Sequence, residues 1–154
     1  MGAKKLVEFL QKNKTKFKTI KHDLAYTAPE IAQKAHIKGQ DFAKTVMVRI
    51  DGKLAMAVLR GNDLLDLNQL KKLCKASNVE VVKESEFQNA FPDCEVGAMP
   101  PFGNLYNLNV YVDEELSKDQ KIAFNAGNHK ELCLLSYSDW ERLVHPKKMN
   151  IHKS

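Results

Sequence analysis

The segment 42–50 constrains the fold most, because its residues alternate as a β-strand requires. Alternation puts one mostly apolar set on the face that we expect to point to the core: Phe42, Lys44, Val46, Val48 and Ile50. An Asp51–Gly52 turn then returns the chain through 53–59, an apolar strand that we expect to be buried on both faces. Lys44 either projects into a cavity at the edge of the core, or snorkels to solvent with its stem packed. The strand alone favours snorkelling.

Composition predicts one ordinary globular domain over residues 1–154, with 44% hydrophobic and 28% charged residues. The longest apolar run, 54–59, is too short to cross a bilayer, and we expect no membrane association and no signal peptide. Three widely spaced cysteines without a CxxC pair argue against a disulfide framework and a zinc site. Because the histidines show no HxxH or HxxxH spacing either, we expect no metal, no cofactor and a reducing cytoplasmic location.

The net charge of +5 is concentrated near the N-terminus, where residues 1–50 carry eleven Lys/Arg and four Asp/Glu. Such a patch either attracts a polyanion through its phosphates or is only a solvated surface. The excess comes from a series of lysines: Lys4, Lys5, Lys12, Lys14, Lys16, Lys18 and Lys21.

The hydrophobic periodicity predicts helices over 4–14, 27–36, 66–74, 85–91 and 138–144, with a polar helical turn over 113–118. The second helix begins with a Thr27–Glu30 capping box, and Ser138 is expected to cap the last. Further strands are expected over 17–22, 79–82, 108–112, 122–125 and 132–135, with a solvated lysine tail after 146. Interleaved helices, strands and hairpins predict an α+β fold, with helices flanking one mixed, curved, barrel-like sheet.

The stretch 91–104 is irregular, with Gly97 and Gly103 on either side of Pro100 and Pro101. Glycine frees the backbone and proline stiffens it, so we expect a rigid loop that presents backbone amides and carbonyls. Its apolar members either wall a small pocket or belong to the core: Met99, Pro101 and Phe102.

Three features together resemble the YbaK/ProX family of aminoacyl-tRNA editing domains: the Ala43–Val46 strand with its lysine, the 97–103 loop, and Asn125-Ala126-Gly127 followed by His129. The resemblance runs from His22 to the last helix and implies a YbaK-like fold. It also implies metal-free hydrolysis of the ester between a small, wrongly attached amino acid and tRNA. The implied partners are mischarged tRNA and, in some members, an aminoacyl-tRNA synthetase; we take the monomer as the default state.

In the family, the lysine that matches Lys44 is the central active-site residue, and the loop that matches 97–101 holds the substrate. Ester hydrolysis passes through an oxyanion, which a preorganised cation and backbone amides stabilise. The resemblance extends substrate binding to a wider set: His22, Thr27, Gly97, Ala98, Met99, Pro101, Phe102, Asn125, Gly127 and His129.

Several alternatives stay open on the residues themselves. His22 is also consistent with a hydrogen-bonded structural histidine, and Thr27 with a simple helix cap. Cys94, close to the loop, is a candidate thiol nucleophile, although no neighbouring sequence suggests that it is activated. A module that binds aminoacyl-tRNA or a synthetase without hydrolysis would share the same pocket.

Overall fold

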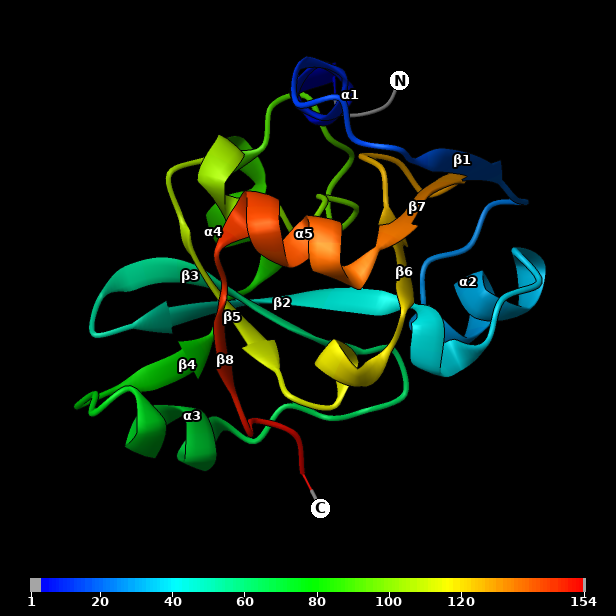
Figure 1. The fold of residues 1–154 in the computed structure, drawn as a ribbon. Helices are drawn as coiled ribbons and strands as arrows, with labels where there is room; N and C mark the ends of the chain where they lie inside the picture. The colour runs from blue at the N-terminus through cyan, green and yellow to red at the C-terminus, as the bar shows by residue number, and fades with distance from the viewer. Residues whose placement is uncertain (1–3, 154) are drawn as a thin grey trace.

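A five-stranded sheet forms the centre of the computed structural model, which describes residues 4–153 (Figure 1). Its strand order is β4-β2-β3-β5-β8. β2 (Ala43–Ile50) pairs antiparallel with β3 (Lys53–Arg60) and β4 (Val79–Val81), whereas β5 (Asn109–Asp113) runs parallel to both β3 and β8 (Lys147–Met149). The 51–52 turn therefore makes the predicted hairpin, and β3 is buried on both faces as predicted.

A second, antiparallel sheet has the order β1-β7-β6, with β1 at Lys18–Lys21, β7 at Glu131–Ser136 and β6 at Lys121–Asn125. The α+β class is confirmed, but the expectation of one barrel-like sheet is wrong. An isolated parallel bridge between Phe42 and Ala123 joins the two sheets, and β4 meets β2 only at 48–50. On the edge of β2 opposite β3, the described residues place no strand between those two points, so the sheet does not close there and that edge stays open.

Five α-helices surround the sheets in the described chain: α1 (Lys4–Lys12), α2 (Ala28–Lys34), α3 (Leu67–Leu73), α4 (Glu84–Phe87) and α5 (Tyr137–Val144). The predicted capping box of α2 is present, with Thr27 and Glu30 as its two members. The predicted cap of α5 is wrong, because Ser136 rather than Ser138 accepts from the amide of Asp139 at 3.1 Å. None of the helices in 4–153 is long and apolar enough to cross a membrane.

Both faces of β2 are covered, whereas the alternation of its residues predicts that only one face points to the core. Ala43 and Met47 belong to the main core, while Val48 packs in a second cluster with Leu59 and Leu70 of α3. Side chains alternate as expected, but helices and the second sheet enclose the central sheet from both sides (Figure 1). Alternation identifies the two faces of a strand and cannot show that both are buried.

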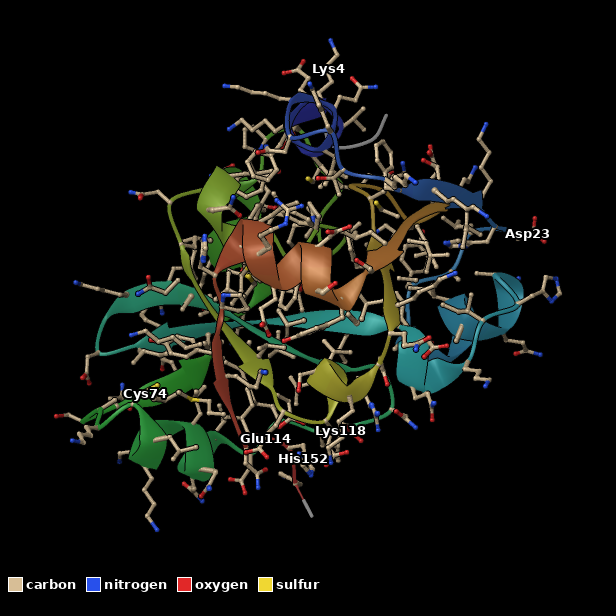
Figure 2. The ribbon with its side chains drawn as sticks, viewed as in Figure 1. Lys4, Asp23, Cys74, Glu114, Lys118 and His152 are labelled. Carbon is tan, nitrogen blue, oxygen red and sulfur yellow. The ribbon has the colours of Figure 1, made fainter. Side chains whose placement is uncertain are left out.

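The C-terminal lysine tail is not simply solvated. Residues 147–149 form β8 beside β5, and Asp113 at the end of β5, which is 0% exposed, accepts hydrogen bonds from the amides of Ile151 (2.8 Å) and His152 (3.0 Å). Figure 2 labels His152 and Glu114 near the C-terminus, where the amide of Glu114 donates to the carbonyl of Met149 at 3.1 Å. Asp113 therefore ends β5 and anchors the C-terminal segment, and the predicted helical turn over 113–118 is reduced to a 3₁₀ helix at Leu116–Lys118.

Candidate active site

A cavity of about 180 Å³ lies at the open edge of β2. The N-terminal half of β2 meets three other segments there: α2 with the residue before its cap, the 91–104 loop, and the last residue of β6. The described residues that line it are Tyr26, Ala28, Ile31, Phe42, Ala43, Lys44, Thr45, Gly97, Met99 and Asn125. The gap between the two sheets thus forms a small hollow with mixed polar and apolar walls.

Lys44 lines this cavity, and its amine donates a hydrogen bond to the backbone carbonyl of Asp63, just beyond β3. Burial lowers the pKa of the Lys44 amine, and the Asp63 carboxylate partly opposes that effect. The strand alone favours a lysine that snorkels to solvent, but the structure places Lys44 half-buried at a cavity wall. An ammonium group has three donors, so the bond to Asp63 leaves two for a bound molecule.

The 91–104 loop is fixed to the rest of the fold by backbone hydrogen bonds. The amide of Gly127 donates to Ala98 at 2.9 Å, and that of Glu95 donates to Gly127 at 2.7 Å. The Trp140 indole N–H of α5 donates to the carbonyl of Pro101 at 3.0 Å. Gly97, whose φ of +83° suits glycine, then faces the cavity. These bonds hold the loop in place, and it borders the same hollow as Lys44.

Of the other loop residues named from the sequence, Met99 alone lines the cavity. Met99 lines the cavity and also belongs to the main core. Ala98 and Pro101 are buried, and Phe102 packs in the core with its ring centroid 5.4 Å from that of Phe124. None of these three residues lines the cavity.

His129 holds the loop from the opposite side. Its backbone amide donates to the carboxylate of Glu95 at 2.7 Å, and its ring Nε2 lies 2.8 Å from the carbonyl of Val96. Because a carbonyl only accepts, Nε2 carries the proton in this arrangement. The ring also packs on Tyr26 at 4.6 Å between centroids. His129 is therefore placed to position the loop and the cavity rim.

Neither His22 nor Thr27 lines the cavity. The His22 amide donates to the carbonyl of Lys130 at 2.8 Å, which continues the β1–β7 pairing, and its Nδ1 lies 2.6 Å from the carbonyl of Asp23. Thr27 is exposed and caps α2, accepting from the amide of Glu30 at 3.4 Å. These positions agree with a structural histidine at 22 and with a helix cap at Thr27.

Asn125 does line the cavity, from the end of β6. Its Oδ1 is buried and has no hydrogen-bond partner among the described residues. A buried acceptor without a partner costs free energy, so such a group is suited to a bound donor. The cavity wall therefore carries a cation at Lys44 and a free acceptor at Asn125.

Sequence reasoning missed Tyr26, Ala28, Ile31, Phe42, Ala43 and Thr45 as cavity residues. The α2 capping box places Ala28 and Ile31 in the first turns of a helix, which is a usable signal, but where that helix docks is a tertiary property. Ala43 and Thr45 lie on the opposite side of β2 from Lys44, and all three reach the cavity because it opens at the strand's edge.

Cys94 does not line the cavity. Burial raises the pKa of its thiol to about 11, and its sulfur lies 3.6 Å from the Tyr106 hydroxyl and from Asp93. A thiol with a raised pKa is a poor nucleophile at neutral pH, so this geometry gives the thiol-enzyme alternative no support. Within 4–153, no three His, Cys, Asp or Glu side chains converge as metal ligands.

Comparison with known proteins adds independent information. A family model described as "Aminoacyl-tRNA editing domain" matches residues 22–143. The multifunctional Ser/Thr-tRNA deacylase ProXp-y of Escherichia coli K12 is 23% identical over 156 residues, which cover 97% of this chain and 92% of that protein. A proline–tRNA ligase of Dehalococcoides mccartyi strain 195 is 33% identical over 107 residues, 68% of this chain but only 18% of the ligase.

The fold matches solved structures over its full length. A structure described as a trans-editing enzyme for prolyl-tRNA synthetase superposes with a TM-score of 0.83 at 17% identity, covering 99% of this chain and 97% of that one. At this identity the likeness concerns the fold alone.

Proposed function

This chain belongs to the aminoacyl-tRNA editing domain family, and we propose that it hydrolyses the ester between a small amino acid and the wrong tRNA. The observation that carries the proposal is the shared cavity, whose wall contains Lys44 from β2 and Gly97 from the stiff loop. The resemblance inferred from Lys44, the 97–103 loop and the 125–129 segment is confirmed at the level of the family. The residue roles and the size of the amino acid belong to the proposal.

In the proposed reaction, water or a neighbouring ribose hydroxyl adds to the ester carbonyl carbon, and the bond to the ribose oxygen then breaks. That ribose oxygen leaves with a proton, and the amino acid is released as its acid, directly or after a second attack by water. The protonated Lys44 donates an N–H to the oxyanion that forms in between, and it remains protonated throughout. A fixed cation in a partly desolvated cavity stabilises such charge more than it would in water.

The dimensions of the cavity support a small amino acid. Its volume is about 180 Å³, and apolar side chains from three segments narrow it: Ala28, Ile31, Phe42 and Met99. Size exclusion by such walls rejects larger side chains but discriminates only about 10- to 200-fold per methylene among small ones. Asn125 Oδ1 is suited to accept from the ammonium or a hydroxyl of the substrate.

Action in trans, on a separate cytoplasmic tRNA, is supported by the near full-length match to ProXp-y. The smaller match within proline–tRNA ligase makes a synthetase the natural candidate for a partner. We retain the monomer as the default state of the proposal.

The test replaces Lys44 with methionine, which keeps most of the packed stem but removes the charge. Purified variants are incubated with a panel of mischarged tRNAs, and the release of free amino acid is measured. We expect Lys44→Met to lower kcat about 10²- to 10³-fold while the fold is retained, because the cation at the oxyanion is lost. Lys53→Met, at the exposed end of the hairpin, is the matched control and should behave as wild type.

Unchanged release by Lys44→Met would remove the amine from the mechanism. Binding of mischarged tRNA without release of amino acid by the wild-type chain would instead identify the non-catalytic module.

A further inference from the structure

Three exposed apolar residues belong to segments that contact His129 beside the cavity: Leu24, Tyr26 and Val96, which are 46%, 63% and 42% exposed. Their segments converge on this histidine through separate contacts. The amide of Ala25 donates to the His129 carbonyl at 3.2 Å, the Tyr26 ring packs on the imidazole, and the imidazole binds the Val96 carbonyl. We call the two ring side chains among them, Tyr26 and His129, the aromatic rim.

Tyr26 connects this rim to the cavity, because it also lines the hollow that contains Lys44. Its backbone amide donates to the Glu30 carboxylate at 3.3 Å, so the segment is held by the α2 capping box. Its ring lies 4.6 Å from the His129 ring at a tilt of 52°, and most of its surface is open to solvent. A tyrosine on a held backbone has few side-chain torsions to order, so it presents a flat apolar face at low entropic cost.

The packing of the core does not explain the position of the Tyr26 ring. Tyr26 and Leu24 belong to none of the buried clusters, so neither is needed to fill the core. An exposed apolar group at the mouth of a pocket is typical of a ligand contact rather than of packing. The occupant follows from the proposed function, on which the inference rests. A substrate whose acyl group sits beside Lys44 carries one ribose and then its terminal base immediately outside the cavity.

We infer that the aromatic rim is a stacking subsite for the terminal nucleobase of the tRNA, with the face of Tyr26 as its platform. Bases stack on aromatic side chains regardless of sequence, because every base has a π-face. The His129 ring is held by its bond to the Val96 carbonyl, and it packs against the Tyr26 ring. The subsite would place the ribose ester at the cavity mouth while the cavity itself selects the amino acid.

The experiment measures binding rather than turnover, so that it stands apart from the hydrolysis assay. The probes are alanyl- and seryl-adenosine analogues in which an amide replaces the ester, and matched analogues that lack the base. Dissociation constants are measured by calorimetry for wild type, Tyr26→Phe and Tyr26→Ala. Val81→Ala, which alters another exposed apolar side chain, on β4, is the matched control.

We expect Tyr26→Ala to weaken binding of the adenosine analogues about 5- to 150-fold, the range for loss of one base–aromatic stack. Tyr26→Phe and Val81→Ala should stay within about twofold of wild type, because a π-face persists in each case. Base-free analogues should bind all four proteins equally. The inference is overturned if Tyr26→Ala weakens both kinds of analogue alike or neither kind, or if wild type binds none of them.

Hydrolysis is assayed separately on the mischarged tRNA panel. Base-dependent binding that requires the Tyr26 ring, without release of amino acid, would defeat the proposed function and leave the stacking subsite standing. If amino acid is released at the same rate by wild type and Tyr26→Ala, the proposed function stands and the stacking subsite is contradicted.

Discussion

At the scale of single residues, Lys44 shows how position changes the chemistry of a common side chain. On an exposed surface its amine would be fully hydrated, whereas here burial disfavours the charged form and lowers the pKa. The backbone carbonyl of Asp63 holds one donor and orients the group without neutralising it. The residue is therefore suited to bind developing negative charge, at some cost to the stability of the fold.

The stability of the fold and the proposed hydrolysis should both depend on pH through the ionisation of the Lys44 amine. In the proposed mechanism hydrolysis needs the charged amine, so kcat/KM should fall with rising pH from a point below the ordinary lysine pKa of about 10.4. In the same window the native chain binds fewer protons than the unfolded chain, so the free energy of unfolding should rise with pH. The measurements are a pH–rate profile corrected for spontaneous ester hydrolysis, and urea denaturation of wild type and Lys44→Met.

The stability increase should be absent from Lys44→Met. An alkaline limb at or above the ordinary lysine value would mean that burial does not set the working pKa of this amine.

At the scale of elements, the 91–104 loop depends on two glycines for different reasons. Gly97 has a positive φ and faces the cavity, and a Cβ there would lie 3.0 Å from the Glu84 carboxylate. Gly103 is buried, and a Cβ there would lie 2.5 Å from the backbone oxygen of Leu108. One glycine shapes the site, and the other lets the loop pack against the strand that follows.

We expect Gly97→Ala to destabilise the fold by about 1–2 kcal/mol, the usual cost of a left-handed conformation for a residue with a Cβ. Because the displaced backbone borders the cavity, kcat/KM for tRNA deacylation should fall by a larger factor than for any neutral surface change. Gly39→Ala is the matched control, since its Cβ would meet nothing within 4 Å. Urea denaturation and the release assay measure the two effects, and equal behaviour of both variants would contradict the role given to the loop.

At the scale of the whole molecule, the lysines of α1 and β1 lie on one side of the fold. Lys4 on α1 and the lysines of β1 lie on the side of the second sheet, while Cys74 and α3 lie at the opposite end (Figure 2). β1 runs directly into the 22–26 segment that leads to the cavity. In the proposed function, this basic surface would contact the tRNA backbone while the acylated end of the tRNA enters the hollow.

If these lysines contact phosphates, tRNA affinity should fall steeply with salt, because each contact releases a condensed counterion. The double variant Lys16→Gln/Lys18→Gln should reduce the slope of log Kd against log salt by about two. Lys71→Gln/Lys72→Gln on α3 removes the same charge from the opposite end and should leave the slope nearly unchanged. Fluorescence anisotropy with labelled tRNA measures both, and a flat salt response in wild type would show that the lysine surface is only solubilising.

Local rules explain most of the elements that were predicted correctly. The 51–52 turn and the apolar run 53–59 specify a hairpin with a buried return strand, and the Thr27–Glu30 box specifies the start of α2. The local rules failed where the partner is distant in sequence. β8 is a short lysine-rich strand that exists because it pairs with β5 and because Asp113 binds the residues that follow it.

The sequence by itself determined the α+β class, the face of the strand that carries Lys44, the glycine–proline loop and the family. Each of these depends on residues that are neighbours along the chain, or on a pattern of residue types. Only the tertiary structure decided that the two sheets fail to close beside β2, and that the gap becomes a cavity shared by Lys44, Gly97 and Asn125. The reason is physical: a cavity belongs to the packing of segments far apart in sequence, and no local propensity specifies the space left between them.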